Sequence, residues 1–299
     1  MMIQEQSQSP TVRQRVAAVF RSSRPISWVN TAFPFGAAYL LLGGALDWVF
    51  VVGVLFFLVP YNIAMYGIND VFDYESDIRN PRKGGVEGAV LSKSLHSTVL
   101  WAAGVSVVPF AIALYAAGTW VSALWLTACL AAVYAYSGPN LRFKERPILD
   151  SITSSTHFVG PALVGGTMLG RELPAPFWVV ILAFFLWGMA SHALGAVQDV
   201  KADRDGGLRS IATELGGRTT VRLAVVAYVV TSALLLLLGI PGAIVAAANV
   251  LYIANAARFW NVSEEESFEV HRAWKVFLWG NYFAGAVVCM TLIWVFVNG

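Results

Sequence analysis

The sequence predicts an all-α integral membrane protein with nine transmembrane helices. Of its 299 residues, 57% are hydrophobic and 13% are charged, whereas a typical soluble domain carries about 25% charged residues. The apolar residues form runs of roughly 17–25 residues, the length at which a helix crosses a bilayer. Lys and Arg are confined almost entirely to alternate connections between those runs. Composition, run length and charge placement therefore all indicate a multi-span membrane protein.

Nine apolar runs define the expected helices in chain order. Three pairs of neighbouring runs are separated only by short turns, at Leu46–Asp47, Gly118 and Ile240–Pro241, whereas charged or longer connections separate the others. A short turn interrupts the hydropathy only briefly, so the boundaries there are the least sharply defined. The predicted helices cover residues 26–46, 47–68, 97–117, 119–137, 151–169, 175–198, 221–239, 241–257 and 273–297.

The chain is predicted to have one folded domain. Residues 1–24 lack the apolar core and small-residue cleavage site of a signal peptide, so we interpret them as a cytoplasmic N-terminal arm. Residues 25–299 then form a single transmembrane domain, because the longest connection, about 70–96, is too short for a soluble domain. Cys129 and Cys289 fall within predicted helices and indicate neither a disulfide framework nor a CxxC metal site.

The basic residues predict the orientation in the plasma membrane. If the N-terminus is cytoplasmic, then the arm and the connections after helices 2, 4, 6 and 8 are cytoplasmic as well. These segments hold every one of the 20 Lys and Arg residues except Arg171. The positive-inside rule therefore places the N-terminus in the cytoplasm and Gly299 outside. Because topology explains the basic residues, nothing in the charge distribution supports nucleic-acid binding.

Two groups of acidic residues stand at the cytoplasmic ends of predicted helices. Asn69, Asp73 and Asp77 are spaced i, i+4, i+8, and Asp199 and Asp203 are spaced i, i+4, so each set shares one helix face. Facing carboxylates repel one another unless cations lie between them. Mg²⁺ prefers such oxygen ligands and often accompanies a phosphorylated substrate. The pattern therefore favours an enzyme that handles a diphosphate at a membrane surface.

The alternative for either group alone is a solvated helix end. That alternative is stronger for the run Glu264–Glu266, since Ser263 and Glu266 have the spacing of a capping box. Glu75 and Asp205 fall out of helical register with the two acidic sets, so we expect supporting or solvent-exposed roles for them.

Four segments resemble the UbiA superfamily of intramembrane prenyltransferases. Asn69-Asp70-x-x-Asp73-x-x-x-Asp77 resembles its NDxxDxxxD motif. Asp199-x-x-x-Asp203 with the following 206–211 resembles its second aspartate motif, although Ala202 stands where the commoner form has glycine. The other two segments are Arg24-Pro25 before the first helix and the run from Tyr134-x-Tyr136 to Arg142 and Lys144. The resemblance extends over nearly the whole chain.

The resemblance implies nine helices around a central cavity into which an allylic diphosphate docks head-first. It implies two Mg²⁺ ions, one held by Asn69, Asp73 and Asp77 with Asp70 as a supporting ligand, the other by Asp199 and Asp203. The four aspartates Asp73, Asp77, Asp199 and Asp203 would then be catalytic, because the metals neutralise the leaving group. Six basic residues are candidates for binding the diphosphate oxygens, and the alternative for each is that it only fixes the orientation of the chain in the membrane. They are Arg24, Arg82, Lys83, Arg142, Lys144 and Arg209.

The acceptor is predicted from a narrower resemblance. Segments 24–31 and 80–88 resemble those of bacterial lycopene elongases, which add C5 units to a carotenoid. This implies transfer of a dimethylallyl group to lycopene, a lipophilic acceptor from the bilayer, in C50 carotenoid biosynthesis. The interiors of the predicted helices contain no Lys, Arg, Asp or Glu, which favours a hydrocarbon over an acidic acceptor. The sequence does not identify a protein partner.

Two other functions are open alternatives. An aromatic acceptor would make the enzyme part of quinone, tocopherol or chlorophyll synthesis. Incubating isolated membranes with labelled diphosphate and either lycopene or an aromatic acid distinguishes this function from carotenoid prenylation. A membrane transporter is the alternative outside enzymology. Transporters usually carry polar residues or interrupted helices at mid-membrane, whereas the charges here gather at one surface.

Two histidines, His157 and His192, lie deep within predicted helices. Each lies about 10 Å beyond the cytoplasmic end of its helix, and ionisable groups at that depth are candidates for function. Either could take the final proton or position a water, with His192 the catalytic candidate because it shares a helix face with Asp199. The alternative for each is a neutral histidine bonded to a neighbouring helix. Tyr134 and Tyr136 are candidates for stabilising a carbocation through their ring faces.

Overall fold

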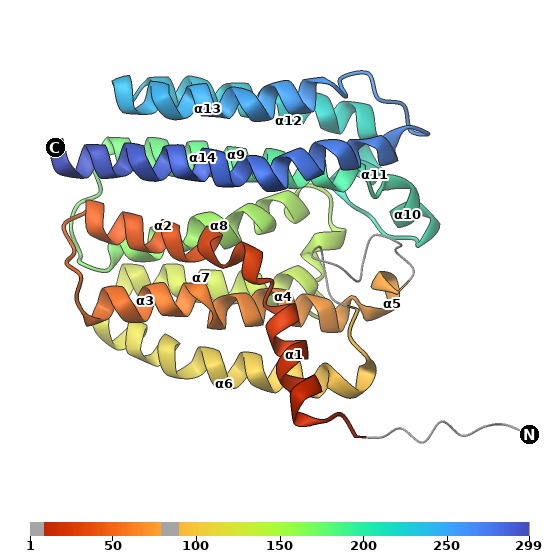
Figure 1. Ribbon diagram of the computed structural model, residues 1–299, viewed down its shortest axis with the longest axis horizontal. Coiled ribbons are helices and arrows are strands. Elements are labelled where there is room, and N and C mark those ends of the chain that lie inside the picture. Colours follow the sequence, from red (N-terminus) through yellow and green to blue (C-terminus); the bar gives the residue numbers. More distant parts are fainter. Residues whose placement is uncertain (1–8, 79–89, 299) are drawn as a thin grey trace, which may run out of the picture.

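The structure is a computed structural model that describes residues 9–78 and 90–298, and within these residues every regular element is a helix (Figure 1). The α-helices are α1 (Val12–Ser22), α2 (Trp28–Leu41), α3 (Trp48–Leu58), α4 (Pro60–Phe72), α5 (Tyr74–Asp77), α6 (Lys93–Ala117), α7 (Trp120–Ser137), α8 (Leu149–Thr167), α9 (Ala175–Val197), α10 (Val200–Asp205), α11 (Ile211–Leu215), α12 (Gly217–Leu236), α13 (Gly239–Ala257) and α14 (His271–Asn298). Short 3₁₀ helices are η1 (Pro25–Ser27), η2 (Phe143–Glu145) and η3 (Ser267–Val270).

Every predicted transmembrane range contains helix, but nine spans are not confirmed. Seven helical stretches of the described chain are long and apolar enough to cross a membrane. The predicted first span, α2, has 14 residues and is shorter than a bilayer-crossing helix. The predicted fifth span, α8, carries polar residues such as Thr153 and His157 that lower its hydropathy, and these are buried inside the protein. A helix surrounded by other helices needs no apolar surface toward lipid, so its hydropathy does not report whether it crosses a membrane.

The predicted second span is interrupted at its middle. The run expected as one helix over 47–68 consists of α3 and α4, which meet at Pro60, and α4 continues to Phe72. Because α3 ends at Leu58, the carbonyls of its last turn lack helical donors. The Asn62 side chain donates to the oxygens of Phe57 and Leu58 at 2.8 and 3.1 Å. The buried amide thus satisfies two backbone carbonyls at the break.

The long helices form two groups with separate apolar cores. The first core lies among α2, α3, α4, α6, α7 and α8 and is centred on the fully buried Phe35, Phe56 and Tyr61. The second lies among α9, α12, α13 and α14 around Tyr228 and Tyr252. Helices α8 and α9 pack against each other and join the two groups. In Figure 1 the second group forms the upper layer and the first group the lower one.

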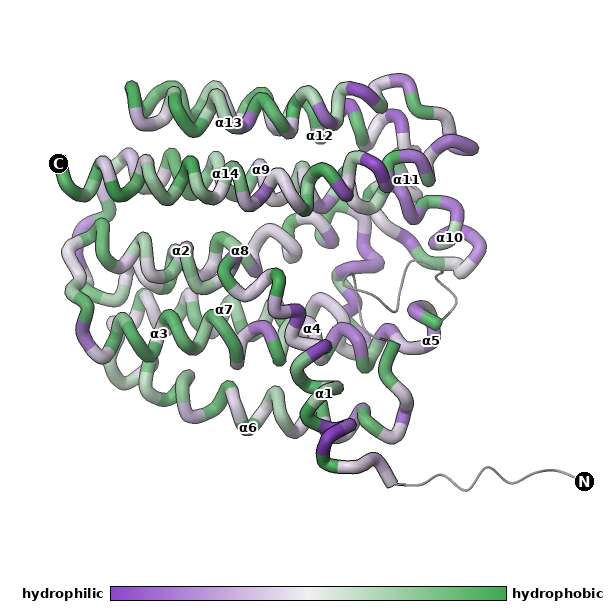
Figure 2. Tube along the Cα trace, in the orientation of Figure 1, coloured by the Kyte–Doolittle hydropathy of each residue, from purple (hydrophilic) through white to green (hydrophobic). Residues whose placement is uncertain are grey.

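Hydrophilic residues gather at one end of the molecule. Figure 2 shows them around α5, α10 and α11, whereas the long helices behind this end are mainly hydrophobic. We refer to it as the polar end. Arg171 lies at the opposite end, where its guanidinium packs against Gly43. The structure therefore separates the charged groups as the sequence pattern predicted.

The predicted N-terminal arm contains a helix, α1, rather than only extended chain. Thr11 caps it in a capping box with Gln14. Figure 1 shows α1 running across the direction of the long helices near the polar end. Its apolar Val12, Val16 and Phe20 share one face and are 78%, 64% and 56% exposed, as in a helix that lies at a membrane interface.

Candidate active site

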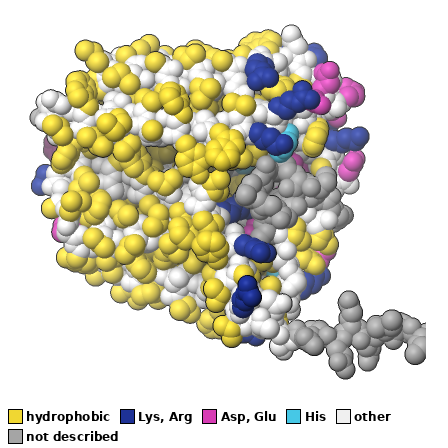
Figure 3. Space-filling view, in the orientation of Figure 1, with side chains coloured by type: hydrophobic (Ala, Val, Ile, Leu, Met, Phe, Trp, Pro, Cys, Tyr) yellow, Lys and Arg dark blue, Asp and Glu magenta, His cyan; other side chains and the backbone are white. Residues whose placement is uncertain are grey.

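A cavity of about 1910 Å³ runs through the molecule between the two helix groups. Its wall follows the length of α9, from Pro174 just before the helix to Asp199 just after it. Side chains of α2 form one edge and side chains of α14 the other, and Figure 3 shows the surface hollowed along the line between these two helices. Every charged residue in the lining comes from the segments at the polar end. The remainder of the wall is mainly apolar.

The first predicted set of metal ligands lies at the polar end of this cavity. Asn69, Asp73 and Asp77 all line it. Although α4 ends at Phe72, the backbone bonds from Asp73 N to Asn69 O and from Asp77 N to Asp73 O, 2.9 and 2.8 Å, continue the helical spacing. The three side chains therefore share a face in the way the spacing predicted.

Asp70 lies on another side of α4 and is not part of the cavity wall. Its carboxylate is completely buried and forms an ion pair with Arg24 over 2.9 Å. The Arg24 guanidinium also lies 4.3 Å above the ring of Tyr66, and Arg24 itself lines the cavity. The structure thus places Asp70 as an anchor for Arg24, away from the positions of the predicted metal ligands.

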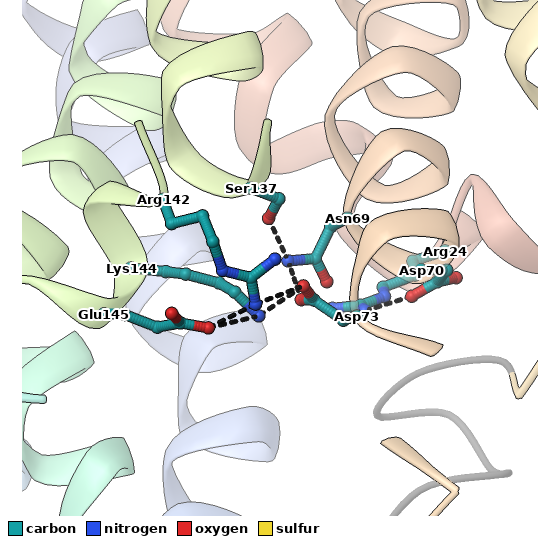
Figure 4. A network of polar contacts seen from close by, with 8 residues as sticks. All are labelled: Arg24, Asn69, Asp70, Asp73, Ser137, Arg142, Lys144 and Glu145. Carbon is teal, nitrogen blue, oxygen red and sulfur yellow. Dashed lines mark hydrogen bonds and ion pairs between the residues drawn. The ribbon is translucent and has the colours of Figure 1, made fainter. Parts of the chain in front are cut away.

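Basic residues surround Asp73 (Figure 4). Lys144 forms an ion pair with Asp73, and a guanidinium nitrogen of Arg142 lies 3.9 Å from the same carboxylate oxygen. Asn69 donates to the other oxygen of Asp73 at 2.7 Å. Both cations come from the short connection between α7 and α8, where Arg142 has a positive φ of 42°. This bend brings the two side chains back toward α4.

Glu145 balances the charge of these two cations. It forms an ion pair with Arg142. Partial burial opposes its ionisation, but the hydrogen bond and charge of Arg142 outweigh that effect and hold the pKa of Glu145 below its usual value. The cluster in Figure 4 is therefore a network of alternating charges.

The second predicted set lies across the cavity from the first. Asp199 and Asp203 line the cavity and remain one helical turn apart, because Asp203 N donates to Asp199 O at 2.8 Å. The following loop also lines the wall through Gly206 and Arg209. Arg209 forms an ion pair with Glu214 over 2.8 Å at the surface. Asp205, expected out of register, is exposed at the rim.

The predicted ligands of the diphosphate have different positions. Arg24, Lys144 and Arg209 line the cavity, whereas Arg142 is not part of the wall although its guanidinium lies 3.9 Å from Asp73. Arg82 and Lys83 lie outside the described residues.

The carboxylates offer only oxygen donors, the ligands that Mg²⁺ prefers. Among the described residues, no three His, Cys, Asp or Glu side chains converge closely enough to hold a metal ion by themselves. Two opposed sets of carboxylates at a cavity mouth are therefore suited to ions that also bind substrate oxygens.

The two histidines differ in their access to the cavity. Both line the wall, but the His192 side chain is 20% exposed whereas His157 is 3% exposed. The Nδ1 of His157 lies 3.3 Å from the hydroxyl of Tyr61. The ring of Tyr136 is nearly perpendicular to both imidazole rings, at centroid distances of 5.6 Å from His157 and 6.4 Å from His192. Tyr134 lies outside the wall and is 48% exposed.

Sequence reasoning did not assign Asp150 to the site. This residue is completely buried in the first turn of α8, and its Oδ2 lies 3.8 Å from Nε2 of His192. A second contact that the sequence did not predict is the hydrogen bond between His271 and Gln198, 2.6 Å long. For Asp150, the one signal in the sequence was an acidic residue at the start of an apolar run. Acidic residues are common at helix N-termini, so this signal alone did not indicate a role in the site.

Sequence relatives agree with the motifs described above. Residues 31–281 match the UbiA prenyltransferase family. The chain is 58% identical over 280 residues to a lycopene elongase/hydratase of Corynebacterium glutamicum, which covers 94% of this chain and 98% of that protein. It is 51% identical over 280 residues to the C(50) beta-cyclic carotenoids biosynthesis protein LbtBC of Dietzia sp., covering 93% of this chain and 65% of that protein.

Solved structures share the fold. A UbiA homologue of Archaeoglobus fulgidus bound to GPP and Mg²⁺ superposes with a TM-score of 0.63 at 18% identity, covering 91% of this chain and 99% of that one. A digeranylgeranylglyceryl phosphate synthase gives a TM-score of 0.68 at 15% identity, covering 95% and 99%. At this level of identity the likeness concerns the all-helical fold.

Proposed function

The chain belongs to the UbiA prenyltransferase family and is a membrane prenyltransferase, and from this membership and the shape of its cavity we propose that it prenylates a carotenoid. The donor is an allylic diphosphate, dimethylallyl diphosphate, and the acceptor is lycopene. The reaction extends the C40 hydrocarbon toward a C50 carotenoid. The relative at 58% identity bears the name lycopene elongase/hydratase, which supports this acceptor.

The distribution of charge along the cavity carries the proposal. Helix α9, whose side chains line it throughout, has 23 residues and is about 34 Å long. That length matches the hydrocarbon thickness of a bilayer, about 30 Å. A long rod-shaped polyene fits such a space, because it needs no charged partner along its length. An aromatic acid would have to find its charge partner at the polar end, where the diphosphate also binds.

The hollow between α2 and α14 supports entry from the lipid. Hydrophobic side chains cover most of the face into which it opens (Figure 3). An acceptor dissolved in the bilayer can therefore enter sideways without crossing a charged surface. Its reacting end would lie near the carboxylates and its other end near the opposite side of the membrane.

The oxygen-rich donor set fits Mg²⁺, and we propose that two ions bind with the diphosphate. Asn69, Asp73 and Asp77 would hold one, and Asp199 and Asp203 the other. Bound there, Mg²⁺ supplies Lewis-acid stabilisation of the leaving diphosphate. The homologue of Archaeoglobus fulgidus has been solved with GPP and Mg²⁺ and with DMAPP and Mg²⁺, which supports both the ion and the donor class.

The basic residues of the wall orient the donor. Lys144, Arg24 and Arg209 can donate to diphosphate oxygens that the carboxylates do not reach. Asp70 and Glu145 hold the nearby cations in place through their ion pairs. We infer that Lys144 exchanges its contact with Asp73 for one with the diphosphate when the donor binds.

The same charge pattern supports an orientation in the plasma membrane. We propose that the chain crosses nine times, with the polar end and the N-terminus in the cytoplasm and Gly299 outside. In this arrangement α2 and α8 cross within the bundle although they fall short of the length or hydropathy of the other spans. The carboxylates then face the compartment in which allylic diphosphates are made.

Competition between acceptors tests the function. Purified enzyme in lipid vesicles is given dimethylallyl diphosphate, Mg²⁺, lycopene and 4-hydroxybenzoate together, and products are separated by chromatography. We expect prenylated lycopene and no prenylated 4-hydroxybenzoate. Prenylation of the aromatic acid alone would contradict the carotenoid acceptor. Transfer to neither compound would contradict the carotenoid acceptor and the aromatic acceptor alike.

A further inference from the structure

We propose that His192, positioned by Asp150, is the proton acceptor that completes the transfer reaction. This inference rests on the proposed function and assigns one role within it. It adds Asp150, which the sequence did not indicate, to the preference for His192 over His157.

Three elements hold the Asp150 carboxylate in place. Asp150 begins α8, and its Oδ1 accepts from its neighbour Ser151 N at 2.6 Å. Its Oδ2 accepts from Ile211 N of α11 at 2.7 Å and lies 3.8 Å from Nε2 of His192 on α9. A buried carboxylate is stable only with such partners. Its position is therefore fixed by contacts from both helix groups.

The carboxylate determines which ring nitrogen of His192 is free to accept a proton. A carboxylate beside Nε2 favours the tautomer with hydrogen on that atom. Nδ1 then keeps its lone pair as the acceptor, and the imidazolium formed on protonation is stabilised by the nearby negative charge. Asp150 thus acts through His192 as a positioning residue.

His192 also lies at the depth where the reacting carbon must be. It lies on α9 and precedes Asp199, which follows that helix, by seven residues, a rise of about 10 Å toward the far end of the cavity. A five-carbon group whose diphosphate is held at the polar end points in this direction. The side chain is 20% exposed on the cavity wall, so a substrate atom can approach it.

His157 does not meet these conditions. Its Nδ1 faces the Tyr61 hydroxyl at 3.3 Å, and its Nε2 is covered and has no hydrogen-bond partner among the described residues. Tyr136 packs against its ring, and His157 lines the cavity but is only 3% exposed, against 20% for the His192 side chain. This less accessible histidine of the same cavity serves as a matched control.

The chemistry requires one proton acceptor at this position. The C–O bond of the donor breaks and its electron pair leaves with the diphosphate. The π electrons of the terminal double bond of the acceptor then form the new C–C bond and leave a tertiary cation on the adjacent carbon. Either a neighbouring C–H bond supplies the electrons of a new double bond, or water supplies those of a C–O bond. In both cases one proton is released, and His192 Nδ1 receives it.

The test separates the first step from the last. The donor carries ¹⁸O at its bridging position, and scrambling of this label in recovered donor reports ionisation, whereas carotenoid product reports the complete reaction. Full-length wild-type protein is compared in lycopene-containing vesicles with His192→Gln, Asp150→Asn and the control His157→Gln. The wild type must form product from lycopene, and its failure to do so would contradict the proposed function instead of the role of His192.

We expect His192→Gln to lower the rate of product formation by on the order of a hundredfold or more, with label scrambling and the KM for the donor nearly unchanged. Asp150→Asn should lower kcat by on the order of tenfold with the same retained scrambling, and His157→Gln should change product formation less than tenfold. Normal product formation by His192→Gln would overturn the proposal. So would equal loss of scrambling and product, or a larger loss in His157→Gln than in His192→Gln.

Discussion

Asp73 shows how single residues set the properties of this site. Its carboxylate faces the cavity, contacts Lys144 and receives a hydrogen bond from Asn69 at 2.7 Å. Asp70, three positions earlier, is completely buried and pairs with Arg24. Acidic residues of one motif therefore have different environments, because Asp70 directly follows Asn69 and points about 100° away from it.

Removing the charge of the cavity carboxylates should abolish turnover. We expect Asp73→Asn and Asp199→Asn each to reduce prenyl transfer by on the order of a hundredfold or more, because each takes a ligand from one proposed ion. EDTA should have the same effect on the wild type, and Mg²⁺ should restore activity. Asp47→Asn is the control, since Asp47 caps α3 at the far end of the molecule. Full activity in either cavity variant would contradict the two-ion site.

Asp70→Asn should behave differently from Asp73→Asn. Breaking a buried ion pair costs about 3 kcal/mol or more, so we expect a lower midpoint of thermal unfolding in detergent. The KM for the diphosphate should rise, because Arg24 loses its anchor, while the Mg²⁺ concentration for half-maximal rate stays near that of the wild type. A large increase in that Mg²⁺ concentration would show that Asp70 is a metal ligand after all.

At the scale of helices, the apolar run over 47–68 is interrupted at Pro60, where α3 ends and α4 begins. The last turn of α4 and the residue after it bring Asn69 and Asp73 to the cavity. Asn62 stabilises the break through bonds to two carbonyls and to Thr31, the last at 2.7 Å. The apolar run predicted a helix in this region, but hydropathy did not predict the break.

A double-mutant cycle tests the role of Asn62 at the break. Asn62→Leu should lower the free energy of unfolding by about 2 kcal/mol, because buried carbonyl groups lose their donor. Pro60→Ala allows a continuous helix, in which backbone N–H groups of α4 reach the carbonyls of Phe57 and Leu58, so Asn62→Leu should cost less in that background. Thermal unfolding of the four proteins in detergent measures both effects. Strictly additive losses would contradict a compensating role for Asn62.

Much of the site could be predicted from the sequence, and the exceptions have physical causes. Helical spacing predicted that Asn69, Asp73 and Asp77 share a face, because it depends only on local geometry. The pairing of Asp150 with His192 could not be predicted, since it depends on how α8 packs against α9. The apolar run 151–169 predicted a helix where α8 lies, but its burial among other helices could not be predicted, because it depends on how distant segments pack.

At the scale of the whole molecule, the polar end and the long apolar cavity suit the two proposed substrates. The polar end suits the diphosphate, and the apolar cavity suits the lipophilic acceptor. The charged residues of the cavity wall all lie at the polar end, and the rest of the wall follows α9 toward the opposite end. A water-soluble diphosphate and a lipid-soluble acceptor can therefore reach the same point from different phases. This arrangement requires that the polar end faces the cytoplasm.

Reporter fusions test that orientation. A reporter that is active only outside the cytoplasm should be active when fused after Gly299 and inactive when fused after Gly207, because the loop at Gly207 belongs to the polar end. A second reporter, active only in the cytoplasm, should give the opposite result at both positions. The reverse pattern would place the carboxylates on the wrong side for cytoplasmic diphosphates.

The most direct test of carotenoid prenylation is a chromatogram, with mass detection, of pigments from cells that make lycopene and carry this chain. With ¹³C-labelled five-carbon precursors, we predict new pigments heavier than lycopene by one and two labelled C5 units, with or without added water. Cells carrying Asp73→Asn should contain lycopene alone. Unchanged lycopene in cells with the intact, membrane-inserted protein would contradict the account.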